Sequence, residues 1–230
     1  MIINKINFPI YGIIILISFL MGSIFNYIIL SKNEIEKRHI FLFTFMSIAY
    51  SIFGGINLHS LTTKNYSIFN IGLSSYGGAI GIILAAIIFD KMCHSNGIYI
   101  KSSIMSLPLI YSISKLACFF AGCCYGIPYS GIFSVTYPSG LNIPLLPIQL
   151  IETIVFFIVF LCCILLRNNK NVIATTLILS ALAKFTLDFF RYSHLNETIS
   201  INQWISIAFI IIGLVLILKN KILKNSKVKN

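Results

Sequence analysis

The sequence predicts an all-α, polytopic transmembrane helical bundle of about seven spans. Of the 230 residues, 57% are hydrophobic and only 10% are charged, whereas an ordinary soluble domain carries about 25% charged residues. The chain also contains seven stretches close to the roughly 20 mainly apolar residues that a helix needs to cross a bilayer. We therefore expect one transmembrane domain over residues 1–218 and a basic cytoplasmic tail over 219–230.

The predicted spans follow one another along the chain. They are Phe8–Leu30, Ile40–His59, Ser75–Asp90, Ser102–Ala121, Pro147–Leu166, Val172–Arg191 and Ile199–Leu218. The first has only Lys5 ahead of it and further spans after it, so we interpret it as a retained helix rather than a cleaved signal peptide. The third is short and rich in glycine, which makes its ends the hardest to place.

The positive charges predict the orientation of these spans. Lysine and arginine collect in the cytoplasmic loops of membrane proteins. Here they fall mainly in alternate connections and at the C-terminus, at Lys32, Lys37, Arg38, Lys91, Lys101, Arg167, Lys170, Lys219, Lys221, Lys224, Lys227 and Lys229. The opposite side has Lys5, Lys64 and Arg191, so we expect the N-terminus outside and the C-terminus in the cytoplasm.

The net charge of +11 therefore reflects membrane topology and does not indicate nucleic-acid binding. A basic tail next to a membrane attracts anionic lipid headgroups. The alternative is that the tail is solvated and serves only to retain the topology.

The polar residues of the spans fall in the halves that this orientation places outside. They include Tyr11, Asn57, His59, Tyr76, Lys115, Cys118, Gln149, Glu152, Lys184, Asp188, Arg191, Asn202 and Gln203. An ionisable group inside a bilayer costs at least roughly 2.5–3.5 kcal/mol, so such groups face the bundle interior and mark function. Lys184, Asp188 and Arg191 are four and three residues apart and share one helical stripe.

This set contains more cations than carboxylates, which predicts an anion site. The phosphate of a phospholipid is the nearest anion. The alternative for Lys184 and Asp188 alone is a buried ion pair that only joins helices.

Glycines flank the same predicted outer region. Gly77 and Gly78 begin the third span, and Gly122 and Gly126 begin the loop after the fourth. Glycine permits a close approach of the backbone to a ligand, and the alternative is helix packing through small residues. The loop has Tyr125, further tyrosines and several prolines, a composition typical of a segment at the lipid headgroups.

The cysteines do not match a typical zinc motif. They are Cys93, Cys118, Cys123, Cys124, Cys162 and Cys163. The adjacent pairs lack the ligand separation of two to four residues seen in tetrahedral zinc sites, and no histidine lies near them in sequence; no metal site is expected. Cys118 lies three residues after Lys115, whose charge would favour a thiolate, so it is a candidate nucleophile. An oxidised pair within residues 118–124 is the alternative.

Several segments, taken in order, carry a family resemblance. They are Phe8-Pro9-Ile10-Tyr11-Gly12, Ser75-Tyr76-Gly77-Gly78-Ala79-Ile80-Gly81, Lys115-Leu116-Ala117-Cys118-Phe119, Gly122-Cys123-Cys124-Tyr125-Gly126-Ile127-Pro128, Pro147-Ile148-Gln149-Leu150-Ile151-Glu152, Asp188-Phe189-Phe190-Arg191 and Ile199-Ser200-Ile201-Asn202-Gln203. Together they resemble the bacterial prolipoprotein diacylglyceryl transferase family over nearly the whole chain.

The chain departs from the family pattern at several polar positions. Tyr76 stands where the family motif has a histidine, and Lys115 and Lys184 stand where it has arginines. A Gly-Gly-Arg element of the family reads Gly54-Gly55-Ile56 here. Lysine keeps the charge of arginine but loses its bidentate grip on phosphate.

The resemblance implies transfer of a diacylglyceryl group from phosphatidylglycerol to the thiol of a lipobox cysteine in a prolipoprotein. It implies catalytic roles for Tyr76, Lys115, Lys184 and Arg191. It implies substrate binding by Tyr11, Gly77, Gly78, Cys118, Gly122, Tyr125, Gly126, Gln149, Glu152, Asp188 and Gln203. No cofactor or metal is implied, and we expect a monomer in the bacterial cytoplasmic membrane, in contact with membrane lipids.

Two alternative functions remain. A non-catalytic phospholipid-binding paralogue is favoured by the substituted motif positions. A small transporter is disfavoured because the chain shows no internal repeat and its polar residues gather on one side.

Overall fold

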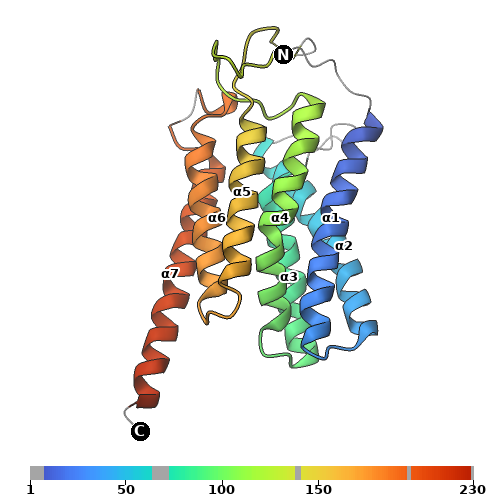
Figure 1. Ribbon diagram of the computed structural model, residues 1–230, viewed down its shortest axis with the longest axis vertical. Coiled ribbons are helices and arrows are strands. Elements are labelled where there is room, and N and C mark those ends of the chain that lie inside the picture. Colours follow the sequence, from blue (N-terminus) through green and yellow to red (C-terminus); the bar gives the residue numbers. More distant parts are fainter. Residues whose placement is uncertain (1–7, 64–72, 138–140, 196–197, 229–230) are drawn as a thin grey trace. The chain divides into compact units, whose positions relative to one another are not determined.

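The computed structural model describes residues 8–63, 73–137, 141–195 and 198–228, which form seven α-helices and one short 3-10 helix (Figure 1). The α-helices are α1 (Phe8–Lys32), α2 (Lys37–Thr63), α3 (Ser75–Cys93), α4 (Ile98–Ala121), α5 (Ile148–Leu165), α6 (Val172–Asp188) and α7 (Ile201–Val228). The predicted all-α class is confirmed. Of the basic residues used to predict the orientation, Lys5, Lys64 and Lys229 lie outside the described ranges.

Six helices of the described chain are long and apolar enough to cross a membrane, so this is a multi-pass membrane protein. The remaining helix, α6, has 17 residues and ends at Asp188. Arg191, the predicted end of that span, lies instead just before the 3-10 helix Tyr192–His194. The last helix continues to Val228, so the segment predicted as a separate tail from residue 219 prolongs α7.

The chain divides into two compact units. Unit 1 comprises Met1–Ser18 and Pro108–Asn230, and unit 2 comprises Phe19–Leu107. Helices α1 and α4 contribute residues to both units. Pro108 stands inside α4 where unit 1 begins. Because proline has no amide hydrogen, one helical hydrogen bond is missing at this position.

In unit 2, helices α2 and α3 pack closely through glycines. A Cβ added at Gly77 would lie 2.7 Å from the carbonyl carbon of Gly54 and 2.8 Å from the Cβ of Leu58. A Cβ added at Gly81 would lie 2.9 Å from the amide nitrogen of Ser51. Side chains at these glycines would push the helices apart, which is why small residues occupy helix interfaces in membranes.

The turn between α3 and α4, also in unit 2, is built around the buried carboxylate of Asp90. Its Oδ1 accepts hydrogen bonds from the Ser95 hydroxyl and, at 3.2 Å, from the Tyr99 amide. Its Oδ2 accepts one from the Ile100 amide at 3.0 Å. These amides belong to the first turn of α4, whose N–H groups have no partner within the helix. Asp90 therefore caps α4.

In unit 1, helices α5, α6 and α7 pack in chain order, as Figure 1 shows. The part of α4 in this unit joins α5, because the Ser112 hydroxyl donates to the Thr153 carbonyl at 2.8 Å. Helix α6 in turn packs closely against α7, because a Cβ added at Gly213 of α7 would lie 2.6 Å from Cγ1 of Ile178 in α6. Unit 1 therefore sets α5 between α4 and α6.

The loop between α4 and α5 folds onto the chain that follows α6. An isolated β-bridge pairs Gly126 with Arg191. A Cβ added at Gly126 would lie 2.6 Å from the Leu146 carbonyl oxygen and 2.9 Å from that of Phe190. Only glycine fits so close to two backbone segments. Tyr125 reinforces the contact, since its carbonyl accepts the amide hydrogen of residue 192 at 3.1 Å.

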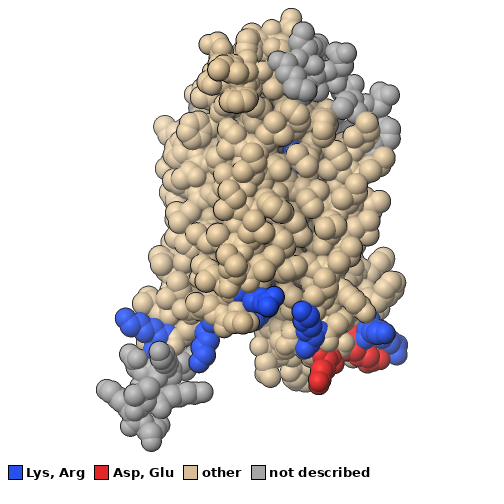
Figure 2. Space-filling model, viewed as in Figure 1, with Lys and Arg blue, Asp and Glu red and all other residues tan. Residues whose placement is uncertain are grey.

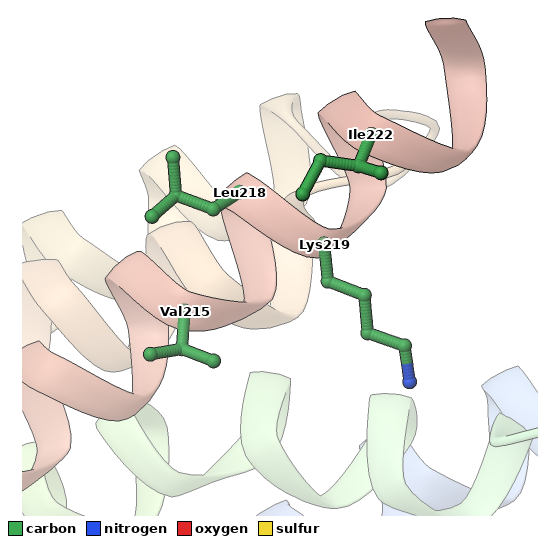
Figure 3. A pocket seen from close by; sticks show the side chains of 4 residues that line it. All are labelled: Val215, Leu218, Lys219 and Ile222. Carbon is green, nitrogen blue, oxygen red and sulfur yellow. The ribbon is translucent and has the colours of Figure 1, made fainter. Parts of the chain in front are cut away.

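The helix surfaces are apolar and the charges lie at the helix ends. Figure 2 shows lysine and arginine in blue, with acidic residues in red beside them, mainly at the lower end of this view, and an almost uncharged surface above them on this face. On α7, the side chains of Val215, Leu218, Lys219 and Ile222 line a shallow hollow and all come from one helix (Figure 3). Three apolar groups and one ammonium suit contact with lipid chains and headgroups rather than a bounded ligand site.

Candidate functional site

The site is centred on Glu152, a fully buried carboxylate near the start of α5. Its Oε2 lies 2.8 Å from Nζ of Lys115 in α4. Its Oε1 lies 2.6 Å from Nη2 of Arg191 and 3.6 Å from Nζ of Lys184 in α6. One carboxylate thus receives three cations from three parts of unit 1. Buried charges require such pairing, because each loses its hydration.

Tyr111 of α4 connects the same groups, and sequence reasoning missed it. Its hydroxyl donates to Glu152 at 2.9 Å and accepts from Lys184 and, at 3.4 Å, from Arg191. Its ring centroid lies 4.9 Å from Nζ of Lys115 and 4.4 Å from Nζ of Lys184. An aromatic face attracts cations at these distances. Tyr111 is one helical turn before Lys115, and that spacing was the available signal.

Asp188, the last residue of α6, supports the arginine. Its Oδ1 lies 3.5 Å from Nε of Arg191, and its Oδ2 accepts a hydrogen bond from the Ser200 hydroxyl. The amide of Ser200 donates to Oε1 of Gln203 at 3.0 Å, and Nε2 of Gln203 donates to the Phe185 carbonyl at 3.3 Å. The chain entering α7 therefore holds Asp188, and Gln203 holds that chain in turn.

Glu152 and five neighbouring residues form what we call the cationic cluster. They are Tyr111, Lys115, Glu152, Lys184, Asp188 and Arg191. Three cations and two carboxylates leave these described residues with one positive charge in excess. Arg191 is the most open of the cations, with 11% of its side chain exposed against 5% for Lys115.

Three thiols gather beside this cluster. The Sγ atoms of Cys118, Cys123 and Cys124 lie within 4.8 Å of one another, and we call these residues the thiol cluster. None of the chain's cysteines forms a disulfide. Lys115 and Arg191 interact electrostatically with the Cys124 thiol. The spacing of these cysteines did not match a zinc motif, and the fold nevertheless brings the three thiols together.

The thiols of the cluster differ in acidity. Hydrogen bonds with Cys118 and Cys123, aided by the charges of Lys115 and Arg191, hold the pKa of Cys124 well below its usual range. Hydrogen bonds with Cys118 and Cys124, together with burial, raise the pKa of Cys123. Among Cys123 and Cys124, the surroundings therefore favour the thiolate form of Cys124 more strongly.

Gln149 connects α5 to the segment after α4 that contains Cys123. Its fully buried side chain donates from Nε2 to the Cys123 carbonyl at 2.7 Å and to the Tyr137 hydroxyl at 3.4 Å. Gly122 adopts a φ of +66°, and a Cβ there would lie 3.0 Å from Cδ1 of Tyr137. Gln149 and Gly122 thus have clear roles in shaping the site, while their contact with substrate stays a prediction.

Most of the predicted site residues lie in unit 1. They are Tyr11, Lys115, Cys118, Gly122, Tyr125, Gly126, Gln149, Glu152, Lys184, Asp188, Arg191 and Gln203. Tyr11 interacts electrostatically with Lys115 and with the thiol cluster. The polar residues predicted to meet from α4, α5 and α6 do so.

The Tyr-Gly-Gly segment lies in unit 2. Tyr76 is buried in the first turn of α3, and the Ser74 hydroxyl accepts the Gly77 amide hydrogen at 3.4 Å. A Cβ added at Gly78 would lie 3.0 Å from Oγ of Ser51. Helix packing, the alternative weighed for these glycines, accounts for their contacts. A catalytic role for Tyr76 and substrate binding by the glycines stay predictions.

Comparisons with known proteins agree over most of the chain. A family model described as prolipoprotein diacylglyceryl transferase matches residues 1–219. The phosphatidylglycerol–prolipoprotein diacylglyceryl transferase of Chloroherpeton thalassium is 26% identical over 238 residues, which cover 91% of this chain and 87% of that protein. The protein of the same name from Rickettsia bellii is 26% identical over 89% of both chains. Clostridium perfringens has a protein of this name that is numbered 2. It is 24% identical to this chain, over 86% of this chain and 84% of the Clostridium perfringens protein.

Proposed function

Because the chain belongs to the prolipoprotein diacylglyceryl transferase family, we propose that it transfers a diacylglyceryl group from phosphatidylglycerol to the lipobox cysteine thiol of a prolipoprotein. Relatives that carry this activity in their names match 91% and 89% of the chain. The bacterial cytoplasmic membrane is the proposed location, with the N-terminus outside. We propose that the protein acts as a monomer without an organic cofactor.

The reaction is an alkyl transfer at sulfur. The S–H bond of the substrate thiol breaks and its proton goes to solvent. The thiolate sulfur forms a bond to the terminal glyceryl carbon, and the bond from that carbon to the phosphate oxygen breaks. The electron pair of that bond leaves with glycerol phosphate, which departs as a dianion. The chemistry therefore needs positive charge at the phosphate and a means of forming the thiolate.

The observation that carries the proposal is the excess positive charge of the cationic cluster. Lys115, Lys184 and Arg191 all converge on Glu152, and Arg191 also pairs with Asp188. A phosphate that enters beside Arg191 offers these cations a further anion. Preorganised cations stabilise the charge that develops on the leaving phosphate, where water is excluded.

The two carboxylates act as positioning groups in this proposal. Glu152 and Asp188 keep the cations in place before substrate arrives. Tyr111 shares its hydroxyl among Glu152, Lys184 and Arg191, so it can follow them when a phosphate replaces part of the Glu152 contact. Tyr76 is a weak candidate for the base, because a tyrosine hydroxyl has an ordinary pKa of about 10.

The proposal is tested by incubating the purified protein with isotope-labelled phosphatidylglycerol and a lipobox peptide. We expect a thioether-linked diacylglyceryl peptide, detected by mass spectrometry. Arg191→Ala and Lys115→Ala should each lower turnover on the order of 10²–10³-fold, as loss of one stabilising donor does. Lys101→Ala, at the other end of α4, is the matched control and should keep full turnover.

Absence of product beside an active relative would refute the proposed function, and full turnover by Lys115→Ala would refute the role of Lys115 at the phosphate. A non-catalytic phospholipid-binding protein is the second candidate. It is favoured by the fact that Lys115 and Lys184 lack the forked geometry of arginine. Saturable phosphatidylglycerol binding without any transfer, lost in Arg191→Ala, would establish that candidate instead.

A further inference from the structure

The thiol cluster has the composition and size of a metal site. The three sulfur atoms already lie within 4.8 Å of one another. Zinc binds thiolates at about 2.3 Å, so sulfurs that share a tetrahedral zinc ion lie about 3.8 Å apart. A contraction of about 1 Å at most would bring the cluster to that geometry. Over the described residues, no histidine or carboxylate joins the three thiols.

The backbone around the cluster adopts an unusual conformation that brings the thiols together. After α4 ends, Gly122 has a φ of +66° and Cys124 a φ of +56°. A left-handed conformation is strained for a non-glycine residue such as Cys124. The Cys123 amide donates to the Cys118 carbonyl at 3.1 Å, and Gln149 holds the Cys123 carbonyl at 2.7 Å. Strain kept in place by surrounding contacts is typical of functional sites.

The exposure of the cluster leaves one side open. Cys124 is exposed, whereas Cys118 and Cys123 are half-buried. Structural zinc sites are closed by four protein ligands, and zinc sites that act on a substrate keep the fourth position open. Three protein thiols with an exposed edge correspond to the second type. The cations beside the cluster suit it as well, because three thiolates and one divalent ion carry a net charge of −1.

We propose that Cys118, Cys123 and Cys124 bind one zinc ion whose fourth coordination position takes the thiol of the prolipoprotein substrate. The proposal deepens the function proposed above and rests on it for the identity of the substrate. A thiol that coordinates zinc gives up its proton, which here would go to solvent while the electron pair stays on sulfur and is shared with the metal. That thiolate then attacks the glyceryl carbon as described above. The metal thus supplies the deprotonation for which Tyr76 is poorly suited.

Metal binding is measured first, without any substrate. The full-length protein is purified in detergent under reducing conditions, stripped of metal with a chelator and titrated with Zn²⁺ or Co²⁺. We expect one equivalent to bind, with the sulfur-to-cobalt charge-transfer absorption of a thiolate site. Cys118→Ser, Cys123→Ser and Cys124→Ser should each weaken binding at least about tenfold. Cys162→Ser in α5 is the matched control and should bind like the wild type.

The substrate thiol provides the second measurement. Addition of a lipobox peptide to the cobalt-loaded protein should shift its absorption as a fourth sulfur coordinates, and a peptide with serine in place of cysteine should not. Zinc removal should lower transfer at least about tenfold, with recovery on adding zinc back. Thermal unfolding and gel filtration of each cysteine variant confirm that the chain is folded.

The outcomes separate this proposal from the proposed function. Transfer that is unaffected by zinc removal or by the triple serine variant overturns the metal proposal and leaves the transferase intact. Zinc and peptide binding without transfer supports the site and overturns the transferase. Stable binding of Cu⁺ but not of Zn²⁺, or a disulfide within the cluster of the protein isolated without reductant together with no metal uptake after reduction, overturns the zinc assignment.

Discussion

Asp90 in unit 2 and Glu152 in unit 1 are both buried carboxylates, and the fold satisfies them in opposite ways. Asp90 accepts hydrogen bonds from one hydroxyl and two amides, all within ten residues along the chain. Glu152 faces three cations and the Tyr111 hydroxyl, with Arg191 and Tyr111 lying 39 and 41 residues away. The first arrangement closes a turn, and the second requires several helices to meet.

The comparison distinguishes a structural carboxylate from a functional one. Neutral local donors satisfy the Asp90 carboxylate through hydrogen bonds, and none of these donors is a cation. Burying the charges around Glu152 carries a desolvation free energy that well-packed apolar residues would not require. Stability alone therefore does not explain why charged residues stand there. We therefore expect changes at Asp90 to alter folding and changes around Glu152 to alter catalysis.

The largest effect is expected for Glu152→Gln. The change keeps the shape of the side chain but removes the Glu152 carboxylate that separates the three cations. Breaking a buried ion pair costs about 3–5 kcal/mol of unfolding free energy. We expect that loss together with a fall in turnover of at least about 10²-fold, measured by thermal unfolding and product formation. Glu36→Gln, at an exposed residue, is the control and should change neither.

Tyr111→Phe should have the next largest effect. The ring and its contacts with both ammonium groups remain, but the hydroxyl that links Glu152, Lys184 and Arg191 is lost. Unsatisfied buried groups of this kind cost about 1–3 kcal/mol. We expect turnover to fall roughly 10- to 100-fold while phosphatidylglycerol binding changes less. Wild-type turnover in this variant would show that the hydroxyl has no part in positioning the cations.

Arg191→Lys should have a smaller effect, because the positive charge is kept. Lysine cannot form the forked contact that arginine makes with phosphate. We expect kcat/KM for phosphatidylglycerol to fall about tenfold, mainly through KM, in steady-state assays at constant peptide concentration. Lys115→Arg introduces a forked guanidinium group and should not lower kcat/KM. An equal fall in both variants would mean that shape at these positions matters more than the fork.

Asp90→Asn should have the smallest effect on activity. It removes a charge that accepts two amide hydrogens at the start of α4, and we expect a loss of about 1–3 kcal/mol in stability. Turnover per folded molecule should stay at the wild-type value, measured after removal of unfolded protein by gel filtration. A specific loss of turnover would mean that the two carboxylates do not differ in the way described.

The fold was predictable because the bilayer imposes a simple rule on the sequence. Apolar runs of about 20 residues mark spans, and all seven predicted spans correspond to helices. The ends of the helices were harder to predict from the sequence. α6 stops at Asp188 because the chain then turns to pair Arg191 with Gly126, and a tertiary contact of this kind leaves no local pattern.

The candidate site was predictable only where it carries charge. Lys115, Lys184 and Glu152 stand out because ionisable groups are rare in spans. Tyr111 bears no charge at neutral pH, and only its place one helical turn before Lys115 distinguishes it in the sequence from a core tyrosine. The thiol cluster depends on left-handed backbone at Gly122 and Cys124; glycine suggests such a turn, but cysteine does not.

The meeting of cations from α4 and from the end of α6 on a carboxylate in α5 has a consequence for biosynthesis. Lys115 is synthesised before Glu152, and a lone lysine in a spanning helix costs roughly 2.5–3.5 kcal/mol on insertion. Helix α4 therefore gains from entering the bilayer together with α5 rather than alone. Lys184 and Arg191 follow when the carboxylate is already in place, so the order of translation matches the order in which the charges can be neutralised.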